Sequence, residues 1–416
     1  MYSRRVLSRC VACLALAVAA CRDGGPPTPQ IRFLHTFGPE ETELFNRLIA
    51  DRGLAVESSL VPFARGQQVI GEILRIGKNC PDLIRIDATW LSGLHAAGLL
   101  RPVPDALAKL DWTPEAIAMV GAPPRGVPQT VDGLVVVRDS SRPAPISSTI
   151  DDLVTAARAT RTTSSPYPLG VRVDGYWFVP WLRAEGIDLA PASIEGEGAV
   201  RALTKFAALF GDVAPPPPPA GSEAPDELRR WHAHEVAYWI TGPWQLGVLE
   251  VRDRLVISPL AKAPRGGQVL VVPTCAQDPE GGWRLAGELA EVAMQQRFAS
   301  EFTTVPTRVS ALAGTTALVR SIYEALRNAE PLPLAPNTPL LFDDLNPAIA
   351  AVIARDATPA EAAEGIRRGW KRIARGARTE VPANDAPQPA PPNDMQQPAP
   401  PPHDLPSAPP GSGSAR

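Results

Sequence analysis

The stretch PDLIRIDATWLSGLHAAGLL, residues 81–100, decides the fold class, because a short apolar strand is followed by a segment with helical periodicity. Residues 82–86 form the predicted strand, and the helical pattern follows Trp90. The same alternation occurs upstream, with strands predicted at 31–35 and 55–60 and helices at 38–49 and 67–76. Repeated strand–helix–strand units predict an α/β fold with a mostly parallel sheet covered on both faces.

The ends of these strands predict where a ligand would bind. In open α/β sheets, ligands bind beyond the carboxyl ends of the strands. This rule places six residues at the mouth of a binding site rather than in the core: His35, Thr36, Phe37, Asp87, Thr89 and Trp90.

Four motifs, in the same order along the chain, resemble those of the extracellular solute-binding proteins of ABC importers, in the group similar to maltose-binding protein. The motifs are residues 81–100, Gly126-Val-Pro128 with Val131-Asp132-Gly133, Tyr238-Trp-Ile-Thr-Gly242-Pro243-Trp244, and Val305-Pro-Thr307-Arg308. The resemblance covers nearly the whole globular part of the chain. It implies a periplasmic-binding-protein-like fold of two doubly wound lobes, with a hinge and a ligand cleft between them, in which ligand binding favours lobe closure.

Two segments depart from the pattern of that family. Residues 134–139 lack the Tyr-Asn-Lys commonly found there, and Phe63-Ala64-Arg65-Gly66 replaces a more polar stretch. Both departures leave the fold prediction intact, but they leave the identity of the ligand open.

Composition and the family resemblance together divide the chain into parts. We expect a signal peptide at 1–20, a lipid-anchored stalk at 21–30, a first lobe formed by 31–132 with 266–307, and a second lobe formed by 133–265 with 308–376. Residues 377–416 are dense in proline, and such a segment buries too little apolar surface to fold. We therefore predict a disordered tail there.

The first 21 residues predict export and membrane anchoring. Arg4, Arg5 and Arg9 precede an apolar run at 10–20 that suits a signal peptide and is too short to span a bilayer. Val18-Ala19-Ala20-Cys21 resembles the lipobox of bacterial lipoproteins, in which the cysteine is lipidated; an ordinary cleaved signal with a leftover cysteine is the alternative. The predicted location is the bacterial cell envelope, outside the cytoplasm, with lipidated Cys21 as the membrane anchor.

Charge and motif content argue against several function classes. The net charge of -3 over 416 residues gives no basic surface of the kind that nucleic acid binding needs. His232 and His234 are two residues apart and do not share a helix face, so we expect no metal site. Neither a Gly-x-Ser-x-Gly elbow nor a phosphate-binding Gly-Lys-Ser/Thr loop occurs, so we expect no enzyme activity and no cofactor. Cys80 and Cys275 could form a disulfide or be two buried thiols.

Aromatic residues carry the prediction of a sugar site, since they make up only 6% of the chain. Flat aromatic rings bury the apolar faces of sugars while nearby polar groups bind the hydroxyls. Trp244 is the strongest candidate because it follows a strand, a glycine and a helix-starting proline. The full candidate set is Trp244, Trp90, Tyr176, Trp177, Asp87, Asp132, Arg308 and His35.

Each candidate also has a purely structural interpretation. The aromatic rings could pack in the core, Asp132 could serve the turn before Gly133, Arg308 could form a surface ion pair, and His35 could be a hydrogen-bonded core histidine.

The sequence therefore predicts a monomeric, lipid-anchored substrate-binding protein that presents a mono- or oligosaccharide to the permease subunits of an ABC importer. A ligand-sensing lipoprotein of the same fold is the alternative. A glycan-processing enzyme is a weaker one.

Overall fold

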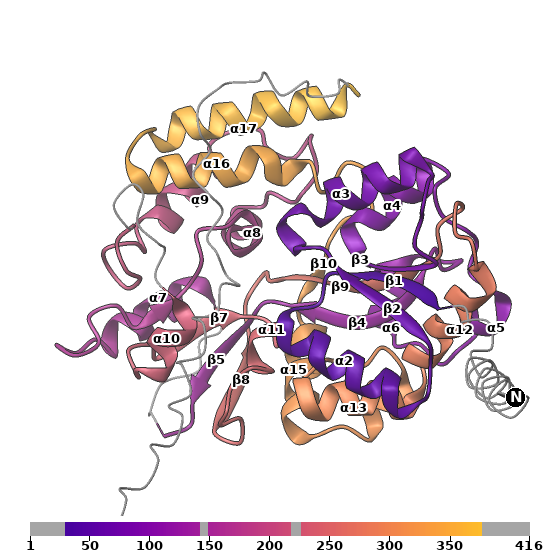
Figure 1. Ribbon diagram of the computed structural model, residues 1–416. Coiled ribbons are helices and arrows are strands. Elements are labelled where there is room, and N and C mark those ends of the chain that lie inside the picture. Colours follow the sequence, from indigo (N-terminus) through magenta and orange to yellow (C-terminus); the bar gives the residue numbers. More distant parts are fainter. Residues whose placement is uncertain (1–29, 142–148, 218–225, 377–416) are drawn as a thin grey trace, which may run out of the picture.

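The computed structural model describes residues 30–141, 149–217 and 226–376. The predicted signal peptide, the Cys21 anchor, most of the stalk and the proline-rich tail lie outside these described residues. Figure 1 shows the described chain folded around two sheets, with helices packed against each.

The first sheet has six strands in the order β10-β9-β3-β1-β2, with β4 paired to β9. The strands are β1 (Ile31–His35), β2 (Val56–Leu60), β3 (Leu83–Asp87), β4 (Val127–Gly133), β9 (Pro264–Val271) and β10 (Glu330–Pro331). As the βαβ pattern predicted, β1 is parallel to both β2 and β3. Strand β10 is also parallel to β9, whereas β9 itself returns from the second sheet and enters antiparallel to β3 and β4, so the sheet is mixed.

Nine helices surround or adjoin this sheet among the described residues. They are α2 (Pro39–Asp51), α3 (Phe63–Ile76), α4 (Ala88–Ala96), α5 (Asp105–Ala108), α6 (Pro114–Val120), α12 (Pro279–Leu289), α13 (Val292–Phe302), α14 (Val309–Ala313) and α15 (Ala317–Arg327). In α2, Pro39 occupies the first turn, where its missing N–H has no intrahelical partner to lose. The face that the periodicity predicted to be buried, including Leu44 and Leu48, is buried.

The second sheet has four strands in the order β6-β7-β5-β8. They are β5 (Val135–Asp139), β6 (Leu169–Gly170), β7 (Tyr238–Thr241) and β8 (Leu255–Pro259). Strand β5 is antiparallel to both β7 and β8, and only β6 and β7 are parallel. The helices of this half are α7 (Ile150–Ala159), α8 (Gly175–Ala184), α9 (Gly198–Ala207), α10 (Glu227–His232), α11 (Pro243–Leu246), α16 (Leu341–Ala354) and α17 (Pro359–Ala374).

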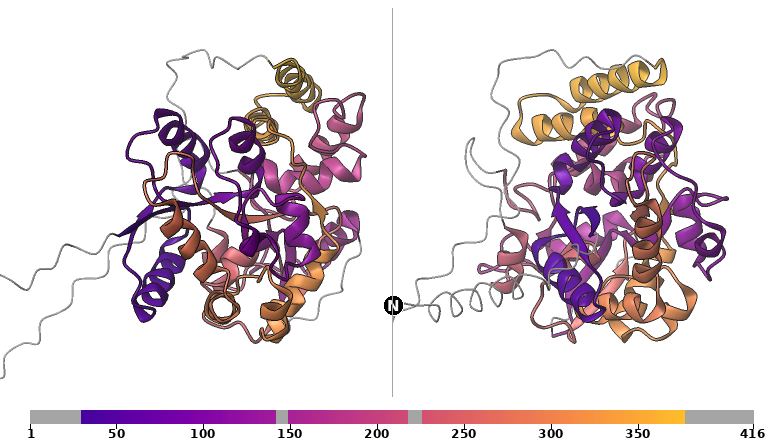
Figure 2. Two further views of the ribbon diagram at one scale, coloured as in Figure 1. Left: turned by 90° about the vertical axis from the view of Figure 1, so that its right-hand side faces the viewer. Right: turned by 45° about the vertical axis from the view of Figure 1, so that its right-hand side comes forward.

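Helices α16 and α17 lie side by side over α9, at the outer edge of the second half (Figures 1 and 2). Trp370 joins them: its ring is fully buried, and its Nε1 donates to the carbonyl of Leu341 at 3.1 Å. A capping box between Thr358 and Glu361 fixes the start of α17.

The chain passes between the two sheets at three places. It leaves β4 at Gly133 and enters β5 at Val135, returns between Pro259 and Pro264, and passes from β10 to α16 through residues 332–340. The lobe boundaries stay a prediction. Helix α15 packs along β8 and contacts β4 and β5, and its buried face lies in a core cluster that holds residues of both sheets, such as Phe33 and Trp239. Helix α15 thus bridges the two halves.

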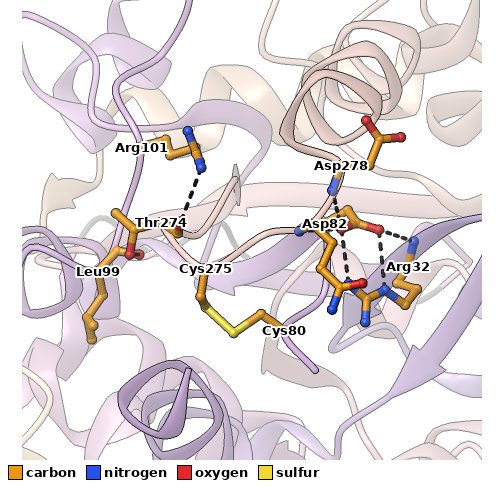
Figure 3. The surroundings of a disulfide bond; sticks show 9 residues. Arg32, Cys80, Asp82, Leu99, Arg101, Thr274, Cys275 and Asp278 are labelled. Atoms are coloured by element: carbon orange, nitrogen blue, oxygen red, sulfur yellow. Dashed lines mark hydrogen bonds and ion pairs between the residues drawn. A yellow bond between two sulfur atoms is a disulfide. The ribbon is translucent and has the colours of Figure 1, made fainter. Parts of the chain in front are cut away.

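A disulfide joins Cys80, just before β3, to Cys275, just after β9, across 195 residues of sequence (Figure 3). This settles the choice between a disulfide and two buried thiols. Beside it, the Asp82 carboxylate accepts hydrogen bonds from the backbone N–H groups of Arg32 and Asp278 at 2.9 Å each. The start of β3 is therefore tied both to β1 and to the segment that follows β9.

Among residues 30–141, 149–217 and 226–376, no helix combines the length and the hydropathy needed to cross a bilayer.

Candidate functional site

Two carboxylates meet at the carboxyl end of the first sheet. Asp87 ends β3, Asp132 lies near the end of β4, and Gln268 on β9 stands between those strands. The Gln268 amide donates from Nε2 to Asp87 at 3.3 Å, and it also hydrogen-bonds to Asp132. Both carboxylates are half-buried, so they lie on a wall that solvent can reach.

Burial leaves these carboxylates poorly solvated. Burial first, and the nearby charge of Asp87 second, raise the pKa of Asp132 to about 7. Burial also raises the pKa of Asp87, although hydrogen bonds from Thr89 and Gln268 oppose that rise. The nearby Arg85 guanidinium already pairs with the Glu41 carboxylate, at 3.5 Å. The pair therefore presents hydrogen-bond acceptors to a ligand that supplies donors.

Three aromatic residues of the second half lie close to one another, and one of them, Tyr176, is within electrostatic range of the carboxylate pair. Tyr176 and Trp177 begin α8, and Trp244 lies in the short helix α11. The Trp244 ring centroid is 6.4 Å from that of Tyr176 and 6.1 Å from that of Trp177. Burial raises the pKa of the Tyr176 phenol well above its usual range, and the charges of Asp132 and Asp87 add to that rise, which places the phenol near both carboxylates.

Local sequence explains how Trp244 is held. A Cβ on Gly242 would lie 2.1 Å from the Trp244 ring, so only glycine lets the ring fold back over the start of α11. Pro243 supplies the first residue of that helix. Trp244 remains half-buried. Trp177 is more deeply placed, at 6% exposed, and its Nε1 donates to the carbonyl of Ile240 at 2.8 Å.

Trp90 lies in a core cluster of the first half. Its neighbour Phe63 was not in our candidate set. The Trp90 side chain is 7% exposed, and it packs on Gly66, where a Cβ would come within 2.6 Å of the ring. Phe63, the first residue of α3, lies 5.4 Å from Trp90 between ring centroids and is 50% exposed. The available sequence signal was its position just after the carboxyl end of β2.

The structure does not place His35 at an open mouth. His35 is 1% exposed and lies among Phe33, Phe37 and Phe45. Burial, with the charge of Arg85, lowers its pKa to about 4, so the ring is neutral at physiological pH. Trp90 is buried in a core cluster, so the mouth prediction was wrong for it. Thr36 and Phe37 are buried too, which corrects the prediction for His35 and these two residues. The reason is that the chain after β1 turns into the core before α2 begins.

The contacts of Arg308 are with residues outside the aromatic group. Its guanidinium pairs with Asp111, and its backbone N–H donates to Gln295 at 3.1 Å. These contacts fit the ion-pair interpretation given above. Arg308 stays a candidate only if the ligand extends to that edge of the first half.

Two of the hollows on the described surface bear on where a ligand could bind, and neither is lined by a candidate residue. A hollow of about 420 Å³ lies between α2 and α13 and contains none of the candidate residues. A second cavity, of about 10 Å³, has room for about one water molecule and is lined by residues that include Ala88, Thr89, Glu115, Met119, Arg265, Gly266 and Leu332. The candidate site therefore rests on the hydrogen bond between Gln268 and Asp87 and on the aromatic contacts of Trp244, and not on either hollow.

Within the described ranges, no three His, Cys, Asp or Glu side chains lie close enough together to hold a metal ion.

Comparison with known proteins bears on the fold. No protein-family model and no curated protein matches the chain. Many solved structures match, and three of them illustrate the similarity. The GacH receptor of Streptomyces glaucescens, studied unliganded and with acarbose, has a TM-score of 0.74 at 21% identity and covers 83% of this chain and 98% of its own. Maltose-bound MalE3 of T. maritima has a TM-score of 0.73 at 18% identity, covering 82% of this chain and 99% of its own. A solute-binding protein of Thermotoga lettingae bound to α-D-tagatose has a TM-score of 0.69 at 22% identity, covering 82% and 100%.

These matches confirm the fold prediction. The chain has the two-lobed fold of the ABC solute-binding proteins that bind maltose and related sugars in those structures.

Proposed function

We propose that this protein is a substrate-binding protein of an ABC importer and that it captures a carbohydrate between its two lobes. The observation that supports the proposal is that the Tyr176 phenol, which lies 6.4 Å from Trp244 between ring centroids, is within electrostatic range of Asp87 and Asp132 of the first sheet. Acceptors that bind hydroxyls beside flat rings that cover apolar faces are what a sugar requires. The fold supports the same proposal, because its solved examples include proteins bound to maltose and to α-D-tagatose.

The proposed mechanism is lobe closure without chemistry. A ligand that contacts Asp132 in the first half and Trp244 in the second binds the closed arrangement better than the open one, so it shifts the population toward closure. We further propose that the protein is a monomer, works outside the cytoplasm at the bacterial cell envelope, is anchored through lipidated Cys21, and delivers its ligand to permease subunits. The lipobox-like sequence at 18–21 supports the anchor.

The proposal is tested by a thermal-shift screen of mono- and oligosaccharides, beginning with maltose, maltotriose, acarbose and D-tagatose. Each hit is then measured by calorimetry on the wild type, on Trp244→Ala and on Trp231→Ala. Trp231 is the matched control, because it is a half-buried tryptophan of the same half that pairs with Trp239 rather than with the site.

Removing a central aromatic anchor costs about 2 kcal/mol of binding, so Trp244→Ala should weaken affinity about thirtyfold while Trp231→Ala leaves it unchanged. Loss of about 3 kcal/mol of stability with full affinity in the folded fraction would instead mark Trp244 as a core residue. Conversion of a bound sugar to product by the wild type would support the enzyme alternative.

A further inference from the structure

Arg183 is a buried charge that the proposed ligand site does not use. It lies near the end of α8, and its side chain is 3% exposed. Burying a guanidinium is costly unless its donors are satisfied, so its partners show what the residue is for. Its Nε donates to Asp188 at 2.9 Å, which leaves the two Nη groups free to point elsewhere.

Both Nη groups bind the backbone of segments that cross between the sheets. Nη1 donates to the carbonyls of Ala263 at 3.3 Å and Glu330 at 3.1 Å, and Nη2 donates to the carbonyl of Pro331 at 3.0 Å. Ala263 is the last residue before β9, and Glu330 with Pro331 forms β10. The planar fork of a single arginine therefore holds two of the three crossovers at the point where they pair.

Arg183 and Tyr176, which are both on α8, hydrogen-bond to the same crossover. They are seven residues apart, which is close to two helical turns, so they lie on one face of α8. The Tyr176 hydroxyl donates to the carbonyl of Pro264 at 3.4 Å, next to the Ala263 carbonyl that Arg183 holds. One end of α8 thus touches the proposed ligand site while the other end holds the crossovers.

We infer that Arg183 is a positioning residue that fixes the hinge to α8 and thereby sets the resting angle between the lobes. This inference rests on the proposed function for its consequence, since a hinge matters only if the lobes move. Its structural content can be tested without ligand.

The experiment is hydrogen exchange of the full chain, read by mass spectrometry, without ligand. Two backbone amides report on the hinge: Glu330 N–H donates to Ala263 at 2.9 Å, and Leu332 N–H donates to Arg265 at 3.0 Å. Arg183→Met should speed exchange of the peptides containing them at least tenfold, and Arg183→Lys, which keeps the charge without the fork, should give an intermediate rise. Arg201→Met is the matched control, because Arg201 is an arginine of the same half that pairs with Glu185 at the surface and lies outside the crossovers.

Hydrogen exchange in the core strands β1 and β7 distinguishes a positioning role of Arg183 from general destabilisation of the protein. If Arg183 acts at the hinge, peptides from β1 and β7 should exchange as in the wild type. The ligand-free variant should also have a larger radius of gyration in small-angle scattering. Uniformly faster exchange across β1, β7 and the hinge would overturn the inference and make Arg183 an ordinary core residue. Unchanged exchange at Glu330 and Leu332 in a folded Arg183→Met variant would overturn it as well.

For the functional consequence, maltotriose serves as the probe. If wild type binds it, Arg183→Met should change its affinity at least fivefold although no candidate ligand contact is removed. If wild type does not bind it, the carbohydrate proposal is weakened while the exchange result stands by itself.

Discussion

The charge of Asp132 makes the stability of the ligand-free protein depend on pH in a predictable direction. Its pKa is raised to about 7, against an ordinary value of about 3.9 for aspartate. Between these two values, the unfolded chain carries a charged carboxylate and the folded protein a protonated one. The folded state therefore binds the extra proton, and the free energy of unfolding falls as pH rises through this window.

The size of the effect follows from the shift. A pKa shift of about three units corresponds to about 4 kcal/mol of unfolding free energy when solvent does not screen the carboxylate. Because Asp132 is half-buried, solvent screens part of this, and we expect about 2 kcal/mol in total. About 1 kcal/mol of this should be lost between pH 5 and pH 8.

The substitution Asp132→Asn isolates this contribution, because asparagine keeps the shape of the protonated side chain and does not titrate. The free energy of unfolding, from reversible urea denaturation at pH 5, 6, 7 and 8, should favour the variant by a margin that grows with pH. Other groups cancel in the difference. His35, for example, has a pKa lowered to about 4, so it contributes stability that is lost as pH falls from about 6.5 toward 4, equally in both proteins.

Asp105→Asn is the control, since the exposed Asp105 pairs with Lys109 and its pKa is lowered. Asp105 is charged in both states above pH 5, so its stability difference should stay flat. If the Asp132→Asn difference is equally flat, Asp132 is well solvated and our description of the site is wrong.

Two other predictions concern the covalent features of the chain. Replacing both Cys80 and Cys275 by serine should lower the free energy of unfolding by as much as about 5 kcal/mol, because the crosslink closes a loop of 195 residues in the unfolded chain; an unchanged urea midpoint would mean that the denatured state is restrained by other means. Cys21→Ser should move the full-length protein from the membrane fraction to the soluble fraction of its host, and continued sedimentation with membranes would reveal a different anchor.

Some of the site could be foreseen from local sequence. The strand–Gly–Pro–Trp arrangement placed Trp244 at the start of a short helix, and Gly242 is explained by the ring that folds over it. This inference succeeded because it depends on residues within one turn of each other.

Other parts needed the tertiary structure. Gln268 joins Asp87 across 181 residues of sequence, and Arg183 reaches Pro331 across 148, so no local pattern could connect them. His35 ends a strand as predicted, yet it is buried because Phe37 and Phe45 close over it. The position of a residue at the end of a strand does not predict whether the residues that follow will bury it.

The sequence alone determined the order of the strands and helices at the start of the chain and the faces that they bury, because hydrophobic periodicity is a property of neighbouring residues. It also carried the motifs from which the fold was recognised. Only the tertiary structure decided the antiparallel entry of β9, the pairing of Cys80 with Cys275, and the convergence of Asp132 and Tyr176. Periodicity reports which side of an element is buried and carries no information about the partner that buries it, so contacts between distant segments appear only when the sheets are assembled.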